Sequence, residues 1–475
     1  VLKRLDLGGG APQTLAPASN GAGGTWSADG VIVFAPSMTT PLLRVAATGG
    51  PVGNVTTLGP RELGQFAPSF LPDGRRFLFF QRDGVDGPGI YLGALDANAP
   101  MQLTPAAGSG VFLPSGWLLW VRAGTQTLVA QRLDVDKGAL TGELVTVADG
   151  VGVDANLSAV SVAASGLVAY RVGTGGQRQL TWFDRSGKAQ GTIGDPDATL
   201  SNPRVSPDGR RVVVERAVRG NTDLWLLDGP RTIRFTFDPA RDYRPVWSPD
   251  GTRIAFSSGR TGHVDLYQKL ASGAGSEERV LASDQLKVLS SWSADGRFLL
   301  YLTIDPQTLE DLWVVPMLGA RAPSVFLKTR FEEAVGQFSP DGRWVAYYQT
   351  NESGARDVYV RPFVPPGAVT TAPGVAEGQW QVSTAGGFLP VWRRDGKELY
   401  YISPAGEMMA APITVVGDTF QPGAPVVLFP TRIVGGGGGQ MGVNYDVAPD
   451  GRFLINTELP GDAAPITLIQ NWQPG

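Results

Sequence analysis

The sequence offers few side chains for acid–base or metal chemistry. It contains one histidine, His263, and no cysteine. Sites built from several imidazoles, such as a histidine-rich manganese site, and all thiolate chemistry are therefore excluded. His263 ends the Gly-containing segment 259–263, so we expect it in an exposed turn. No Gly-x-Ser-x-Gly motif supplies a nucleophile for a Ser-His-Asp triad.

Carboxylates and arginines are the remaining groups that could act at a site. Arg241, Asp242 and Arg244 lie together just before an aromatic strand end, and we predict that they line the mouth of a channel and bind a ligand there. Two carboxylates at a defined separation could support glycosidase-type chemistry, but the sequence gives no reason to pair particular acids. We predict no metal site and no cofactor; calcium needs only oxygen ligands and stays possible without a supporting motif.

The composition is that of a turn-rich globular chain. Apolar residues make up 42% of the 475 residues and charged residues only 18%, with 63 glycines and 37 prolines. Many short strands joined by tight turns would produce this balance. The net charge of −4 comes from interspersed acids and bases without a basic stripe, so we expect no nucleic-acid partner. No apolar run reaches the roughly 18 residues of a membrane helix, and we predict no membrane segment in this chain.

One repeat runs along the whole sequence. Its anchor is an apolar or aromatic residue, then Ser, Pro or Ala, Asp and Gly, with looser copies, and it recurs ten times at intervals of 42 to 55 residues. Such a period is typical of β-propeller blades. The aspartates that we assign to structural turns are Asp29, Asp73, Asp208, Asp250, Asp295, Asp341, Asp395 and Asp450. In two copies, ending at Gly116 and Gly166, serine replaces the aspartate.

The segments between anchors predict four strands per repeat. In the clearest copy, an inner strand ends at Trp247, a Ser-Pro-Asp-Gly turn follows, and a second strand runs through Phe256. A third strand begins with the acid of Asp265-Leu266-Tyr267, and an outer strand lies near residues 279–281. The acid, apolar, aromatic triplet recurs at residues 223–225, 311–313 and 357–359. Four strands per period make a propeller blade, so we predict an all-β propeller of about ten blades.

These residues resemble a known repeat. Ser-Pro-Asp-Gly followed by an Ile-Ala-Phe-like strand and an Asp-Leu-Tyr strand is similar to the TolB-type, WD-like propeller repeat. The segments 23–26, 179–188, 264–269, 336–347 and 392–399 also resemble the C-terminal sensor regions of bacterial membrane-spanning serine/threonine kinases. That resemblance implies an extracytoplasmic location. The kinase itself is absent, because His263 precedes Val264 rather than Arg-Asp and no Asp-Phe-Gly exists.

Two arrangements of the blades are compatible with the spacing. We favour two rings: residues 1–176 with about four blades, which could form an incomplete ring, and residues 177–475 as a six-bladed TolB-like propeller. The outer strand near 189–193 would then complete the last blade beside Ile466–Ile469. One ten-bladed ring is the alternative. The chain opens on a strand-like alternation without an initiator Met, so we expect it to be part of a longer product.

The expected function is binding rather than catalysis. We predict a sensor or scaffold propeller that binds a peptide, a protein or a small molecule at a propeller face. The alternative is a hydrolase or lyase that uses carboxylates and arginines at the channel mouth. A purely structural scaffold within an assembly is a third possibility.

Overall fold

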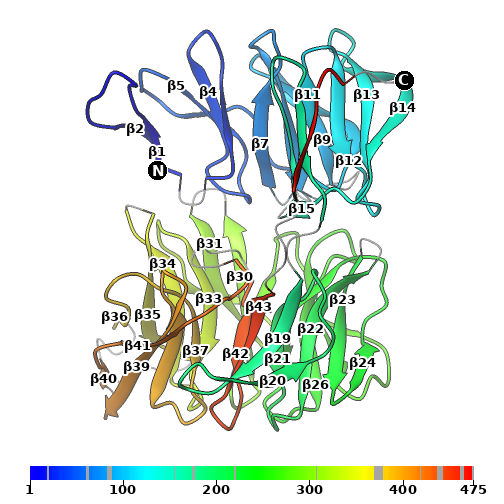
Figure 1. Cartoon of the computed structure of the whole chain (residues 1–475). Helices are drawn as coiled ribbons and strands as arrows, with labels where there is room; N and C mark the ends of the chain where they lie inside the picture. The colour runs from blue at the N-terminus through cyan, green and yellow to red at the C-terminus, as the bar shows by residue number, and fades with distance from the viewer. Residues whose placement is uncertain are drawn as a thin grey trace. The chain divides into compact units, whose positions relative to one another are not determined.

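The computed structural model describes most of the chain: residues 1–18, 21–59, 62, 64–82, 88–154, 156–173, 177–218, 221–305, 308–352, 354–367, 378–417, 419–435, 442–459 and 465–472. Within these ranges every regular element is a β-strand, all strand pairs are antiparallel, and eight of the twelve sheets are four-stranded (Figure 1). The prediction of an all-β propeller built from four-stranded blades is confirmed. The described residues include no helix long and apolar enough to cross a membrane.

The chain divides into two compact units. One consists of residues 1–176 with 460–475, and the other of Gln177–Leu459. The second unit contains six sheets. In sheet order they are β20(Ala189–Ile193)-β19(Arg178–Phe183)-β43(Phe453–Glu458)-β42(Tyr445–Val447), β21(Ser201–Val205)-β22(Arg211–Val218)-β23(Asn221–Asp228)-β24(Arg231–Arg234), β25(Asp242–Trp247)-β26(Arg253–Ser258)-β27(Asp265–Leu270)-β28(Glu278–Leu281), β29(Val288–Trp292)-β30(Phe298–Asp305)-β31(Leu309–Pro316)-β32(Ser324–Leu327), β33(Glu333–Phe338)-β34(Trp344–Thr350)-β35(Arg356–Pro362)-β36(Trp380–Gln381), and β37(Phe388–Trp392)-β38(Glu398–Ile402)-β39(Glu407–Val416)-β40(Thr419–Pro422), with β41(Val426–Pro430) also paired to β39.

The six inner strands close a ring. β21 contacts β25, β25 contacts β29, and the series continues through β33, β37 and β42 back to β21. This is the six-bladed ring that the last six Asp-Gly turns predict. Each inner strand begins at one face of the ring and ends at an Asp-Gly turn at the other. We call these the entry face and the turn face.

The blade that closes the ring takes strands from both ends of this unit. β19 pairs with β43 through Arg178↔Glu458, Leu180↔Asn456 and Phe183↔Phe453. The expected neighbour of the strand 189–193 was wrong: Ile466–Ile469 forms β44, which pairs with β18(Val168–Arg171) of the other unit. A four-residue apolar strand can complete any open sheet edge, so the sequence does not distinguish the two positions.

The first unit has shorter and more varied sheets. They are β1(Leu2–Arg4)-β2(Gln13–Ala16), β3(Gly24–Trp26)-β4(Val31–Phe34)-β5(Leu43–Ala46)-β6(Gly53–Asn54), β10(Ala97–Pro105)-β9(Gly89–Ala94)-β8(Arg76–Arg82)-β7(Gly64–Phe70), β11(Val111–Leu113)-β12(Trp117–Val121)-β13(Leu128–Asp134)-β14(Ala139–Ala148), β15(Val153–Asp154)-β16(Leu157–Ser158), and β17(Val160–Val162)-β18-β44. Apolar side chains such as Val33, Phe66 and Leu118 join three consecutive sheets into one core.

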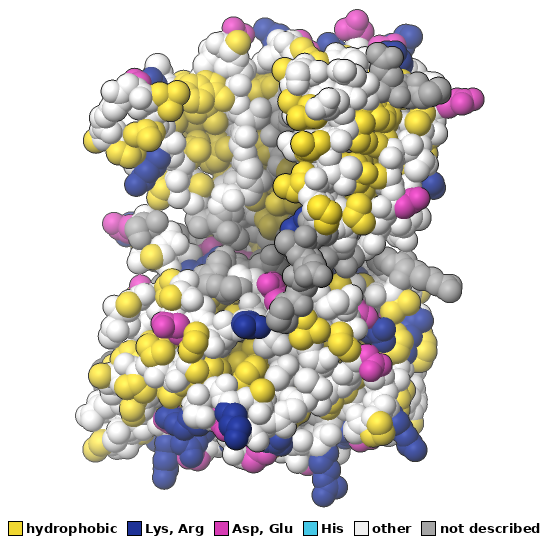
Figure 2. All heavy atoms as spheres, in the orientation of Figure 1, with side chains coloured by type: hydrophobic (Ala, Val, Ile, Leu, Met, Phe, Trp, Pro, Cys, Tyr) yellow, Lys and Arg dark blue, Asp and Glu magenta, His cyan; other side chains and the backbone are white. Residues whose placement is uncertain are grey.

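The repeated turn has the same hydrogen bonds in blade after blade. In the copy after β25, Ser248 Oγ donates to Asp250 Oδ1 at 2.6 Å and accepts from the Arg253 N–H at 2.9 Å. Gly251 has a φ of 69°, a value that favours glycine. The Ser, Asp and Gly of the anchor therefore reverse the chain and fix the register of the next strand. Figure 2 shows Lys and Arg side chains gathered at one end of this unit, at the bottom of the view.

In four blades, an acid at or near the start of the third strand binds a residue of the fourth strand or of the connection after it. Asp223 binds Arg234 at 2.7 Å, Asp311 lies 3.2 Å from Lys328 Nζ, and Asp357 accepts from Ser383 Oγ at 2.8 Å. Asp265 pairs with Lys287, which is 1% exposed. The acid, apolar, aromatic triplet seen in the sequence is thus a structural device that joins the third strand to the loop leading to the next blade.

Candidate functional site

The inner strands of the second unit carry β-bulges near the entry face. Register shifts between the first and second strands coincide with positive φ at Asn202 (48°), Arg244 (56°), Val335 (52°) and Leu389 (56°). Each of these residues lies three positions before the residue that ends its inner strand. Non-glycine residues rarely adopt this conformation, and bulges of this kind re-aim side chains at the rims of barrels and beside functional sites.

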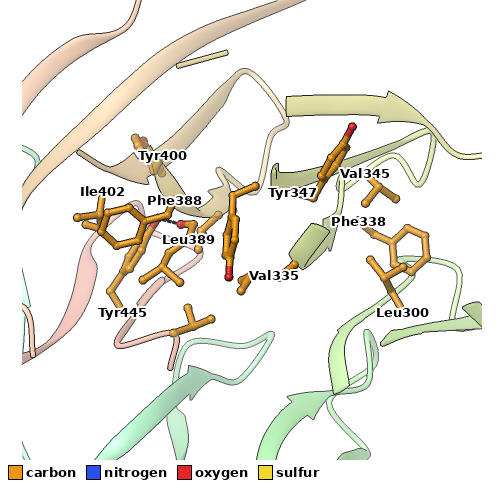
Figure 3. Close-up of a cluster of buried hydrophobic side chains, with 14 of the residues drawn as sticks. Leu300, Val335, Phe338, Val345, Tyr347, Phe388, Leu389, Tyr400, Ile402 and Tyr445 are labelled. Carbon is orange, nitrogen blue, oxygen red and sulfur yellow. Dashed lines mark hydrogen bonds between the residues drawn. The ribbon is translucent and has the colours of Figure 1, made fainter. Parts of the chain in front are cut away.

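Two of these bulges lie in an apolar part of the ring. Val335 and Leu389 are 4% and 5% exposed and belong to a core that spans several blades. Figure 3 shows Leu389 beside Phe388, with Val335 between Leu389 and Phe338 in this view. The Tyr445 hydroxyl donates to the Leu389 carbonyl at 2.7 Å. This contact links two neighbouring blades and satisfies the Leu389 carbonyl at the bulge.

The rest of the ring is polar and centres on Glu215, which is 1% exposed. Its carboxylate accepts from Asn202 Nδ2 at 2.6 Å, Ser201 Oγ at 3.0 Å and the Arg244 backbone N–H at 2.7 Å. The last of these bonds crosses from one blade to the next and uses the N–H of a bulge residue. Glu215 therefore holds both polar bulges in place.

A second group of acids lies near the start of the following blades. The Tyr348 hydroxyl donates to Glu332 Oε1 at 3.2 Å, and Arg356 Nη2 lies 3.5 Å from the same oxygen. Glu310 is 3% exposed, and its Oε2 has no hydrogen-bond partner among the residues that the structure describes. Burial raises the pKa of Glu310 well above its ordinary value, and the neighbouring Glu332 carboxylate raises it further. Glu310 thus favours its protonated form, which can donate a hydrogen bond.

Arg204 and Asp446 complete the group. Asp446 Oδ2 accepts from the Val205 N–H at 2.7 Å, and the negative charge of Asp446 favours the charged form of the half-buried Arg204. We call Arg204, Glu215, Arg244, Glu310, Glu332, Tyr348, Arg356 and Asp446 the axial cluster. Its members come from five of the six blades, and most are buried.

The predicted ligand-binding residues have separate surroundings in the structure. Arg244 is part of the axial cluster. Arg241 borders it, because its guanidinium lies 3.8 Å from Glu215 and packs over the Tyr243 ring. Asp242 is fully buried and bound by Arg260 Nη2 at 3.0 Å, so it is a partner in an internal ion pair.

Sequence reasoning missed the other members of the cluster. They are spread over residues 204–446, and only closure of the ring brings them together. A signal did exist: Asn202, Arg244 and Leu389 each precede a proline at the same repeat position. Proline has no N–H for the strand ladder, and it marks bulges in sheets.

The structure also describes the single histidine and the side chains that could hold a metal ion. His263 lies before β27, with a side chain that is 25% exposed and an Nε2 atom 3.8 Å from Asp284 Oδ1. Over the described ranges, no three His, Asp or Glu side chains gather in an arrangement that could hold a metal ion. Whether a cofactor or calcium is used stays a prediction from the sequence.

Comparisons with known proteins agree with the repeat pattern. Residues 163–362 match the TolB beta propeller domain family. A Tol-Pal system protein TolB from Anaeromyxobacter dehalogenans (strain 2CP-C) is 33% identical over 225 residues, which are 46% of this chain and 51% of that protein. The chain thus spans about half the length of the curated TolB relatives it matches. Tricorn protease homolog 1 from Streptomyces coelicolor is 31% identical over 114 residues, or 23% of this chain and 11% of that protein.

Solved structures give weaker similarities. A putative TolB from Agrobacterium tumefaciens is 17% identical with a TM-score of 0.46, covering 60% of this chain and 99% of that one. TolB from Acinetobacter baumannii is 14% identical with a TM-score of 0.36, covering 65% and 79%. The sequence matches and the four-stranded blades agree: residues 163–362 are similar to the TolB beta propeller domain, and the fold is an all-β propeller.

Proposed function

We propose that the chain is a binding propeller whose second unit receives a segment of a protein partner at the entry face. The observation that carries this proposal is the axial cluster, in which five blades place buried and half-buried charged groups together. Among the described residues, Glu310 Oε2 is left without a hydrogen-bond partner. A cluster that served only stability would be expected to satisfy all of its hydrogen-bonding atoms. A ligand that supplies the missing partners would explain the arrangement.

The relatives support a partner protein rather than a small metabolite. Three of the curated relatives are named Tol-Pal system protein TolB, and this name supports a role among other proteins. By the same similarity we propose that the propeller acts outside the cytoplasm. The resemblance to kinase sensor regions suggests one context for such a module, in which the propeller senses a ligand for an attached protein.

A hydrolase or lyase is the second candidate, and one observation favours it. Glu310 is a buried acid with a raised pKa, and Arg356 and Tyr348 lie near it. A carboxylic acid kept protonated in this way can serve as a general acid. The enzyme would use Glu310 to protonate a leaving group. Conversion of a bound ligand that is lost in Glu310→Gln, while binding is retained, would establish this alternative.

Photo-crosslinking from the two faces of the ring tests the binding proposal. A photoreactive phenylalanine replaces Arg330 or Glu352 at the entry face, where the side chains are 73% and 79% exposed. Matched positions at the turn face are Arg297 and Arg452, with side chains 58% and 40% exposed. After irradiation in cells that produce the protein, we expect one discrete crosslinked partner from the entry-face positions only. Equal labelling from both faces, or labelling from the turn face alone, would contradict the proposal.

A further inference from the structure

Two arginines of the axial cluster have no hydrogen-bond acceptor. Arg204 on β21 and Arg244 on β25 lie on neighbouring inner strands. Arg244 is 8% exposed and Arg204 is half-buried. Within the described part of the chain, neither guanidinium forms a hydrogen bond or an ion pair within 4 Å. A guanidinium has five N–H donors, so both side chains can still donate to an acceptor that enters the site.

The nearest carboxylates are already used by other donors. Glu215 accepts from a hydroxyl, a side-chain amide and the backbone N–H of Arg244 itself. Asp446 accepts from the Val205 N–H at 2.7 Å and the Val447 N–H at 2.9 Å. Both acids influence the arginines through charge but do not provide them with a hydrogen bond. Negative charge therefore lies near the two arginines, but their guanidinium groups have no hydrogen-bond acceptor among the described residues.

The positive charges of the two guanidinium groups also repel each other. Burial lowers the pKa of both arginines, and the positive charge of Arg204 lowers that of Arg244 further. Two other buried cations of this unit are well bonded: Lys287 Nζ has four oxygen acceptors within 3.1 Å, and Arg260 is bound to Asp242 and Glu277. The guanidinium groups of Arg204 and Arg244 differ from both in having no such acceptor among the described residues.

We infer that Arg204 and Arg244 form a seat for one carboxylate group of the partner, which rests on the proposed binding function. A planar carboxylate matches the fork of a guanidinium and can accept from both side chains. A single negative charge suits the site when Glu310 is protonated. The cluster and its neighbour Arg241 then hold four arginines and only three carboxylates, those of Glu215, Glu332 and Asp446. The seat is largely buried, so a slender group enters it: an acidic side chain or the carboxyl terminus of a peptide.

Short peptides distinguish these two sources. One probe is an acetylated, amidated peptide with a single central glutamate, and another is an acetylated alanine peptide with a free C-terminus. An acetylated, amidated alanine peptide and inorganic phosphate serve as controls. We expect calorimetry or chemical-shift titration of the full chain to show saturable binding of one or both carboxylate probes, and weaker or no binding of the controls.

Arginine variants locate the binding site. Arg204→Met and Arg244→Met should each weaken the carboxylate probe at least about tenfold, because each removes charge-assisted hydrogen bonds. Arg297→Met is the control: Arg297 lies at the turn face and is already paired with Asp295, so a change below about threefold is expected. Arg204→Lys and Arg244→Lys keep the charge but lose the fork, and should fall between these limits.

A thermal measurement separates this role from a structural one. Removing an unmet buried charge should leave the melting temperature of the unliganded protein unchanged or raise it, whereas removing a structural arginine lowers it. A lower melting temperature in both methionine variants would overturn the inference. So would equal effects of all three methionine variants, binding of phosphate as tight as that of the carboxylate probes, or no binding of any probe.

The two proposals fail in different ways. If crosslinks form at the entry face but no carboxylate probe depends on Arg204 and Arg244, the partner uses other contacts and only the carboxylate seat is wrong. If the probes bind as expected but no partner is crosslinked at the entry face, the seat is real and the protein-binding proposal fails.

Discussion

Lys287 gives the sharpest test of how the blades are held together. Its ammonium is buried and contacts Asp265 Oδ1 at 3.0 Å and the carbonyls of Val264, Ser283 and Gln285 at 3.1, 2.8 and 2.7 Å. Lys287→Met keeps a similar side-chain length but leaves Asp265 buried without its main counter-charge. Breaking one partner of a buried pair costs about 3–5 kcal/mol.

The lower end of that range is expected here. Arg279 Nη1 lies 3.8 Å from Asp265 Oδ2 and can take over part of the interaction. A loss of about 3 kcal/mol in the free energy of unfolding would lower the calorimetric transition of this unit by roughly 6–12 °C. Glu352→Gln is the control, because it removes an ion pair in which both side chains are more than 70% exposed. Its transition should move by less than about 3 °C.

A double variant shows whether the loss comes from the pair. In an Asp265→Asn background the buried charge is gone, so Lys287→Met should cost less than half as much as it does alone. The reasoning is refuted if Lys287→Met matches the Glu352→Gln control. It is also refuted if the effects of the two substitutions simply add.

Three further predictions concern a turn, a titration and a close approach. Ser248→Ala removes two hydrogen bonds of a repeated turn and should cost about 1–2 kcal/mol in urea unfolding; no change would show that the turn is held by Gly and Asp alone. Burial favours the protonated form of Glu310, so its contribution to stability is present below its ordinary pKa and is lost as the pH rises through the raised value. Glu310→Gln should therefore make the melting temperature less dependent on pH between about pH 5 and pH 8, and an unchanged profile would contradict this. Gly64→Ala should cost about 3 kcal/mol or more, because φ is 147° and a Cβ would lie 2.1 Å from the Met38 carbonyl oxygen, whereas Gly53→Ala, with open space around it, should be neutral in the same calorimetric scan.

The sequence predicts the blades well because the information for them is local. A Ser-x-Asp-Gly turn forms its hydrogen bonds within six residues, as the Ser248 turn shows, and alternation of apolar residues identifies the strands beside it. The third-strand acid is also visible in the sequence as part of a triplet. Its role is not, because the partner of Asp265, Lys287, lies 22 residues further along the chain and has no fixed spacing in other blades.

The axial cluster depends on information that is not local. Arg204 and Asp446 are 242 residues apart, and they meet only because β42 closes the ring beside β21. The sequence predicts Arg244 as a site residue because it lies beside other charged residues. The same criterion also selects Asp242, which in the structure is the partner of Arg260 in an internal ion pair. Arg244 lies three residues before the end of its inner strand, at the bulge, and Asp242 does not. This position in the repeat distinguishes Arg244 from Asp242 better than their charge does.

The pairing of distant strands also constrains how the protein is made. β19 can pair with β43 only after roughly 270 further residues have been synthesised, and β18 can pair with β44 only after β44 has been synthesised. At a synthesis rate of about 5–20 residues per second, the edge of β19 stays open for tens of seconds on the ribosome. During that time an unpaired strand edge is available to other nascent chains. Neither unit can finish folding until the last strands emerge, so we expect production of the intact protein to depend on chaperones that shield these edges.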